Sequence, residues 1–91
     1  MLPHDIKNRI ESGISEAECF VNEFSGGTDH YAVIVVSNSF EGQTLLSRHR
    51  MIMDLFKQEM STGEVHALSI KAFTKKQWET EKTINIKSAA K

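Results

Sequence analysis

The stretch HYAVIVVS, residues 30–37, decides the fold. Its β-branched run, Val33-Ile34-Val35-Val36, favours a strand, because branched side chains pack well on a pleated surface. No polar residue interrupts the run, which is typical of a strand buried on both faces. We therefore expect residues 30–37 to form the central strand of a sheet.

Two further elements are expected upstream of this strand. The segment Ala17–Phe24 alternates, with Cys19 and Val21 on one face, and predicts a second strand. Between the two strands, Ser25–Asp29 supplies the glycines and polar residues of a chain reversal. Further upstream, Pro3–Ile14 begins with a proline suited to a first helical turn and repeats isoleucine every four residues. This spacing predicts a short amphipathic helix.

The longest helix is expected downstream, over Gln43–Met60. Its apolar stripe should hold Leu45, His49, Ile52 and Phe56, widened by Leu46, Met53 and Met60. After a break at Thr62 and Gly63, the segment Val65–Phe73 predicts a third strand in which His66, Leu68, Ile70 and Ala72 share one side.

A last helix should begin after Thr74. The spacing of Thr74 and Gln77 matches a capping box, and Trp78 can pack back on the sheet. The element order α-β-β-α-β-α predicts an α+β fold with helices packed on a three-stranded sheet. We expect one domain over residues 1–82, since 91 residues do not supply two cores, and a flexible tail over 83–91.

Composition restricts the setting of the protein. Hydrophobic residues make up 40% and charged residues 25%, as in an ordinary globular chain. The longest strongly apolar run, Tyr31–Val36, is far shorter than the roughly 20 residues that span a bilayer. Met1–Ser12 lacks the apolar core of a secretory signal. The expected location is the cytoplasm, without a membrane partner.

Charge is unevenly distributed along the chain. Residues 1–65 contain five Lys and Arg against ten Asp and Glu, whereas residues 66–91 contain six Lys against two Glu. A basic C-terminal third can favour an acidic partner or nucleic acid, or can simply be a solvated lysine-rich segment. The net charge of −1 lacks the strongly basic balance typical of a DNA-binding domain.

The motifs of several enzyme classes are absent from the sequence. It has no phosphate-cradling glycine loop, no zinc-binding His/Glu pair on a helix and no nucleophile elbow. The single cysteine, Cys19, cannot form an internal disulfide, and in an alternating strand a buried, inert thiol is the commoner outcome. We expect a protein that is not an enzyme.

The histidines are the candidate metal ligands. His66 follows a turn at the start of the third strand, where it suits either a metal ligand or a rim histidine bonded to neighbouring backbone. His30, at the start of the central strand, has the same two interpretations. His49, on the apolar stripe, is expected to be a packed structural residue, and His4 a surface residue.

Two basic groups could contact phosphate. Arg48, His49 and Arg50 are adjacent, but consecutive arginines diverge around a helix and cannot form one clamp unaided. The second group can form a basic face near the last helix, although most such faces are only hydrated and bind no phosphate. It comprises Lys71, Lys75, Lys76 and Lys82.

Taken together, several blocks closely resemble the BolA family. They are Val35-Val36-Ser37, Phe40-Glu41-Gly42, Leu45-Leu46, Arg48-His49-Arg50 and His66-Ala67-Leu68-Ser69-Ile70-Lys71, followed by Thr74 and Trp78. The resemblance covers roughly residues 3–82. It implies a fold similar to class II K-homology domains, in agreement with the predicted element order.

The resemblance also implies a partner and a cofactor. BolA-like proteins associate with monothiol glutaredoxins in heterodimers that can share a two-iron two-sulfur cluster, in which the histidine of the H-A-L-S-I-K block is a ligand. Here that residue is His66. In the family the second ligand comes from the loop between the first two strands, where Ser25–Asp29 has neither Cys nor His and His30 is the nearest candidate. The isolated protein is expected to be a monomer without a cofactor.

A second function stays open at this point. Some bacterial BolA-like proteins are associated with transcriptional control of morphology and stress response, and a DNA-binding regulator would use Lys71, Lys75 and Lys76. No G-x-x-G loop joins two helices as in RNA-binding K-homology domains. A third possibility is that the fold is kept but the partner has changed, with His66 as a structural residue.

Overall fold

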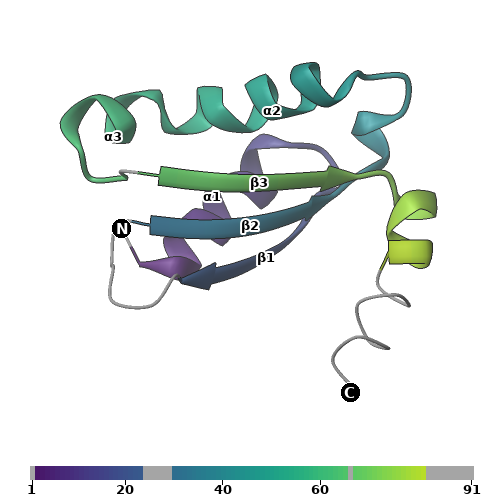
Figure 1. Cartoon of the computed structure of the whole chain (residues 1–91), viewed down its shortest axis with the longest axis horizontal. Coiled ribbons are helices and arrows are strands. Elements are labelled where there is room, and N and C mark those ends of the chain that lie inside the picture. The colour runs from purple at the N-terminus through teal and green to yellow at the C-terminus, as the bar shows by residue number, and fades with distance from the viewer. Residues whose placement is uncertain (1, 24–29, 66, 82–91) are drawn as a thin grey trace.

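The computed structural model describes residues 2–23, 30–65 and 67–81 (Figure 1). Its first half consists of α1 (Pro3–Gly13), β1 (Glu18–Glu23), β2 (His30–Val36) and η1 (Asn38–Phe40). The second half consists of α2 (Leu45–Met53), η2 (Asp54–Phe56), α3 (Lys57–Thr62) and β3 (Ala67–Phe73). A further helix follows over 75–81. The predicted α+β class and element order are confirmed.

The three strands form one mixed sheet in the order β1-β2-β3. β2 is central, as its β-branched run predicts, and it pairs antiparallel with β1 and parallel with β3. The parallel pair requires a crossover, which α2, η2 and α3 supply. These helices run beside β3, and α1 lies behind the sheet in Figure 1.

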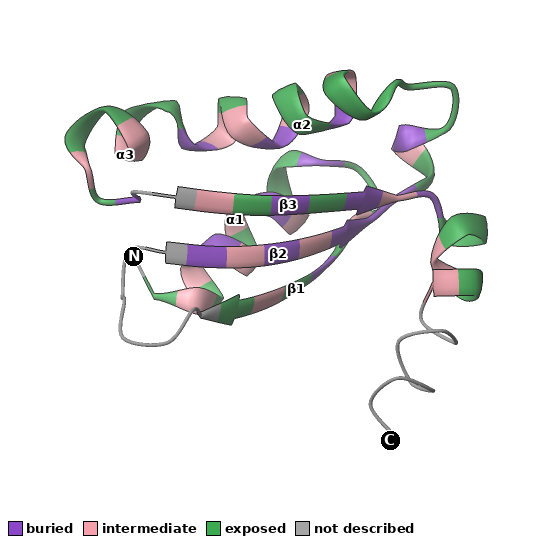
Figure 2. Ribbon diagram, in the orientation of Figure 1, coloured by how far each residue is buried: buried purple, intermediate pink, exposed green. Residues whose placement is uncertain are grey.

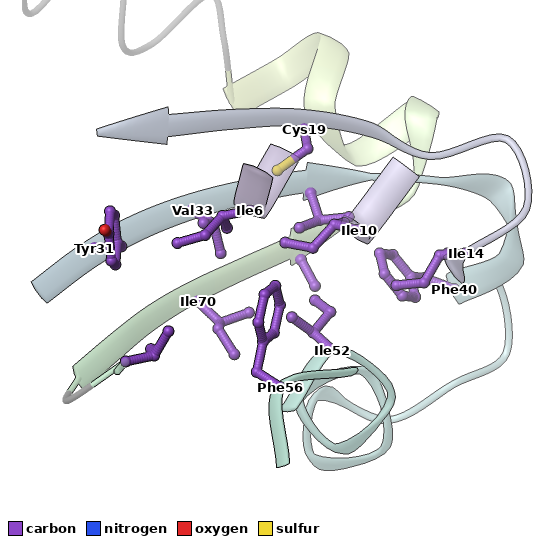
Figure 3. Packing of buried hydrophobic residues seen from close by; sticks show 13 residues of the cluster. Ile6, Ile10, Ile14, Cys19, Tyr31, Val33, Phe40, Ile52, Phe56 and Ile70 are labelled. Carbon is purple, nitrogen blue, oxygen red and sulfur yellow. The ribbon is translucent and has the colours of Figure 1, made fainter. Parts of the chain in front are cut away.

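The hydrophobic core fills one face of the sheet, between the strands and the helices (Figure 3). Ile6 and Ile10 of α1 are fully buried there, as the fourfold spacing predicts, and they pack with the inward residues of β2 and β3. Figure 2 shows buried and less buried positions alternating along the strands. Phe20, Ile34 and Lys71 therefore belong to the opposite face, where Ile34 is half-buried.

The predicted single helix over 43–60 is in fact three segments, α2, η2 and α3. The side chains that face the sheet are Arg48, Ile52 and Phe56, spaced by four, and all three are buried. Leu45 and Leu46 were expected on the apolar stripe, but they are 70% and 61% exposed. The expectation was wrong because both apolar patterns fit helical spacing, and the aliphatic stem of an arginine can bury as a leucine does.

Three strand boundaries also differ from the prediction. The first strand begins at Glu18 and not at Ala17. The second strand ends at Val36, because Ser37, whose amide still donates to the Phe73 carbonyl at 2.9 Å, is the N-cap of η1 and accepts a hydrogen bond from the Ser39 amide through its hydroxyl. The third strand was expected to begin at Val65, but the Val65 amide donates to the Glu59 carbonyl at 3.1 Å instead. His66, predicted on the same side as Ile70, lies outside the described residues.

The capping box before the last helix is confirmed. The Gln77 amide donates to the Thr74 hydroxyl at 3.2 Å, and the Thr74 amide donates to Gln77 Oε1 at 3.0 Å. This start directs Trp78 back onto the sheet, as predicted, where its ring lies 5.5 Å from Phe20 and 5.6 Å from Phe73. The helix thus covers one end of the face that α1 and α2 leave open.

Two other expectations concern the molecule as a whole. No helix within residues 2–23, 30–65 and 67–81 is long and apolar enough to cross a bilayer. The likeness to class II K-homology domains stays a prediction, and the expected tail over 83–91 lies outside the described residues.

Candidate functional site

The two candidate ligand positions belong to the starts of neighbouring strands. β2 and β3 run parallel, and His30, the first residue of β2, pairs with Ala67, the first residue of β3. His66 directly precedes Ala67 in the sequence, but it lies outside the described residues, as does the side chain of His30. The register therefore brings the backbone of His30 beside the residue that follows His66, at one end of the sheet (Figure 1).

The chain reaches this end of β3 through a turn that requires glycine. Gly63 ends α3 with a φ of 84°, in the left-handed region that glycine adopts without steric cost. Val65 is then only 1% exposed, and its amide is bonded to Glu59. The position before His66 is thus held by packing and a hydrogen bond, and the position after it by strand pairing.

A complete metal site is not formed by the described residues alone. Within that part of the chain, no three His, Cys, Asp or Glu side chains come together in a group that could hold a metal ion. A two-iron two-sulfur cluster needs four protein or thiol ligands. The starts of β2 and β3 offer two histidine positions, His30 and His66, so this arrangement fits a cluster only if another molecule contributes ligands.

Cys19 is unsuited to ligation and lies elsewhere. It pairs with Val35 on β2, five residues beyond His30, a separation of about 16 Å along the strand. The side chain is 1% exposed, which confirms the expected buried thiol. Burial raises the pKa of the Cys19 thiol to about 11, and the nearby Glu11 carboxylate is the second cause of this increase. The thiolate that binds metal is therefore scarce at neutral pH.

The polar residues around Cys19 stabilise the edge strand β1. Glu11 Oε2 accepts a hydrogen bond from the Cys19 amide at 3.0 Å, while Lys7 Nζ donates to the Cys19 carbonyl at 3.1 Å. Lys7 and Glu11 are themselves paired at 2.7 Å, which holds the pKa of Glu11 below its usual value. Two side chains of α1 thus satisfy backbone groups of edge strand β1, which is a structural role.

The two remaining histidines lie away from the candidate site. His4 is exposed on α1, as expected, with Nε2 3.3 Å from Asp5 Oδ1. His49 was expected to be packed, but the residue is exposed, and only its Nε2 approaches the sheet, 3.1 Å from the Ile70 carbonyl. Its position follows from the helical stripe, which passes through Arg48 rather than His49.

Three of the candidate phosphate-binding lysines, Lys71, Lys75 and Lys76, are exposed. Lys71 borders a shallow hollow of about 180 Å³ on the open face of the sheet, beside Asn22 and Ser69. Lys75 and Lys76 are on the helix that packs against the same face through Trp78. Lys82 lies outside the described residues. The structure thus places three lysines around one side of the molecule.

Arg48 has a role that the sequence does not reveal. It is only 6% exposed, and its Nη1 donates to the Ala72 carbonyl at 3.0 Å and to Gln77 Oε1 at 2.9 Å. Gln77 Oε1 is also the acceptor of the capping box, so Arg48 links α2, the end of β3 and the last helix. A basic residue four positions before the buried Ile52 is the one signal of this role, and that signal alone cannot identify the acceptors.

Comparisons with known proteins agree in pointing to one family. The sequence model of the family described as "BolA-like protein" matches residues 7–77. The "DNA-binding transcriptional regulator BolA" of Escherichia coli is 44% identical over 55 residues, which cover 60% of this chain and 51% of that protein. "SufE-like protein 1, chloroplastic/mitochondrial" of Arabidopsis thaliana is 46% identical over 48 residues, 53% of this chain and 13% of that protein.

Solved structures show the same likeness. A BolA protein homologue from Coxiella burnetii superposes with a TM-score of 0.69 at 37% identity, covering 87% of this chain and 97% of that one. The chain spans about half of the length of the Escherichia coli protein and 58% of the BolA-like protein 1 of Pongo abelii.

Proposed function

This chain belongs to the BolA-like protein family, and from that membership we propose that it is a non-enzymatic adaptor in iron–sulfur biology. BolA-like proteins, with sequence shared by a SufE-like protein, fit a role in this area. In the proposed complex a monothiol glutaredoxin binds this chain in the cytoplasm. A two-iron two-sulfur cluster is held between the two proteins, and His66 is a ligand from this side.

One observation supports this proposal best, the pairing of His30 with Ala67. It brings the residue that follows His66 and the start of β2 to one end of the sheet, where the second protein would bind in the proposed complex. His66 is the proposed first ligand and His30 the proposed second. The glutaredoxin cysteine and glutathione supply the thiolates, so no cysteine of this chain is needed.

The chemistry of the ligands favours a regulatory or transfer role. Replacing cysteine by histidine on a cluster raises its reduction potential, because a neutral imidazole replaces an anionic thiolate. An imidazole can also be protonated near neutral pH, which releases the metal. His66 would therefore tune both the potential and the release of the cluster cargo.

The test is an anaerobic reconstitution with a monothiol glutaredoxin, glutathione, iron and sulfide, followed by visible circular dichroism. We expect a spectrum that differs from that of the glutaredoxin alone and that is lost in His66→Ala. His4→Ala is the matched control, since His4 is an exposed histidine on α1. A mixture with the spectrum of glutaredoxin alone, or an unchanged spectrum in a folded His66→Ala protein, would contradict the proposal.

DNA binding is the second candidate function, favoured by the name of the Escherichia coli relative. Lys71, Lys75 and Lys76 would contact the phosphates. Neutralising Lys75 and Lys76 together should weaken binding and reduce the slope of log affinity against log salt by about two. Lys57→Gln, which changes an exposed lysine on α3, should leave both unchanged. Equal behaviour of the two variants would remove this candidate.

A further inference from the structure

A groove of about 390 Å³ lies at the other end of β3, beyond the candidate cluster site. Its walls come from three elements: Leu45 at the start of α2, Phe73 at the end of β3, and Gln77 and Glu81 on the last helix. Arg48 forms part of the lining between them. None of these residues has a part in the adaptor role proposed above.

The guanidinium of Arg48 is held in this groove with donor capacity to spare. Its Nε donates to the Gln43 carbonyl at 3.1 Å, its Nη1 makes the two bonds to Ala72 and Gln77, and its Cζ lies 5.8 Å from the ring centre of Phe40. In the described part of the chain no hydrogen bond uses Nη2. That nitrogen is also not among the fully buried atoms without a partner, so part of its surface is accessible to solvent although Arg48 as a whole is buried.

The charge around Arg48 favours an anion. The first turn of α2 contains no acidic residue, and Thr44 caps it by accepting from the Ser47 amide at 3.0 Å. The amides of Leu45 and Leu46 precede the first intrahelical hydrogen bond and add the positive end of the helix dipole. A buried arginine with a free N–H pair and a helix start thus converge on one groove.

Leu45 and Leu46 add an apolar surface beside this anion site. They are 70% and 61% exposed, two of the large hydrophobic side chains that the structure leaves in contact with water. Such an apolar pair next to a guanidinium fits a protein segment rather than a nucleic-acid backbone. Glu81 in the groove wall repels any anion, but it repels a run of phosphates more than a single carboxylate.

We propose that this groove binds a partner protein through a carboxylate next to an apolar side chain. The carboxylate accepts hydrogen bonds from Arg48 Nη2, and the apolar side chain packs on Leu45 and Leu46. The site is distinct from the cluster end, because Ala67 and Phe73 are six residues apart on β3, about 20 Å. The proposal does not depend on iron or on a glutaredoxin.

Small probes can test this site on the full chain by amide chemical shifts. N-acetyl-L-leucine carries the carboxylate and the apolar side chain, N-acetyl-L-leucinamide has no charge, and dimethyl phosphate stands for a nucleic-acid backbone. We expect saturable shifts at Leu45, Leu46 and the Arg48 Nε–H with N-acetyl-L-leucine, and at least fivefold weaker binding of the other two. Equal binding of the amide, stronger binding of the phosphate, or no saturable shift would overturn the proposal.

Two substitutions test the walls of the groove without removing Arg48. Glu81→Gln should tighten binding of N-acetyl-L-leucine roughly threefold by removing a like charge. Leu45→Ser should weaken it by about threefold or more through lost apolar contact. Leu2→Ser and Glu18→Gln are matched controls, since both residues are exposed and neither lines the groove. Controls that change affinity as much as the test variants would overturn the proposal.

Discussion

At its last residues β3 meets a buried arginine, a capping box and a tryptophan, whereas at its first residue it is paired with His30 and preceded by His66. Contacts within the chain join α2, β3 and the last helix at the Phe73 end. At the Ala67 end, the described contacts include the strand pairing, the anchoring of Val65, and the packing of Leu68 and its neighbour Tyr31 in the core. The difference indicates that contacts at the Phe73 end of the strand maintain the fold, while the Ala67 end is where the proposed partner would bind His30 and His66.

Substitution of Arg48 should have the largest effect on folding. Arg48→Met keeps the aliphatic stem but removes the Arg48 donor from the Ala72 carbonyl and leaves Gln77 Oε1 with the Thr74 amide alone. We expect the free energy of unfolding, measured with urea, to fall by about 2–4 kcal/mol. Arg50→Met, at an exposed position of the same helix, should cost less than about 0.5 kcal/mol. Similar losses in the two variants would break the comparison.

High pH offers the second test, because Cys19 lies in the same row of the sheet as Val35 and Ala72, near the Phe73 end. Folding raises the pKa of the thiol from 9.0 to about 11. Between these values the unfolded chain loses the proton first, so stability falls as pH rises, and below pH 9 the thiol has no such effect.

The expected loss from Cys19 is about 2–3 kcal/mol between pH 9 and 11. It is measured as the difference between the wild-type protein and Cys19→Ala, each unfolded by urea at several pH values. If the free energy of unfolding depended on pH in the same way in both proteins, the thiol would not be shielded from solvent in the folded state. The thiol should also resist alkylation in the folded protein and react only after unfolding.

Trp78 should contribute less than either of these residues. Trp78→Leu removes the ring that lies against Phe20 and Phe73, and we expect a loss of about 1 kcal/mol in the free energy of unfolding. Trp78→Phe retains a ring and should recover part of that loss. A leucine variant as stable as wild type would show that the last helix is held by Arg48 and Gln77 without the aromatic contact.

His66→Ala should have the smallest effect on folding, because the proposed role of His66 is in the complex and not in the isolated chain. We expect a change below about 0.5 kcal/mol in the urea experiment. A loss comparable to that of Arg48→Met would assign His66 a structural role instead, and the contrast between the two ends of β3 would fail.

The sequence predicts the sheet well because burial imposes a simple period on strands. The uninterrupted run Val33–Val36 indicates a central strand, and the alternation around Cys19 indicates a strand with one buried face, which the structure places at the edge of the sheet. The capping box is also local, since it needs only Thr74, Gln77 and the backbone between them.

The face of α2 that packs against the sheet could not be predicted in the same way. Two stripes fit its spacing, and the choice depends on whether the sheet offers acceptors to an arginine, which is a tertiary property. The groove beside Leu45 follows from that choice and is equally hidden in the sequence. The role of His66 rests on family resemblance, because no local pattern distinguishes a ligand from a rim histidine.

The most direct test of the adaptor role is to ask which chain supplies the histidine nitrogen bound to iron. This chain is labelled with ¹⁵N-histidine, mixed with unlabelled monothiol glutaredoxin and glutathione, loaded with the cluster, reduced, and measured by pulsed electron paramagnetic resonance. The proposal predicts a ¹⁵N coupling that is present in the wild-type protein and in His4→Ala and lost in His66→Ala. A cluster without any ¹⁵N coupling in the wild-type complex would contradict it.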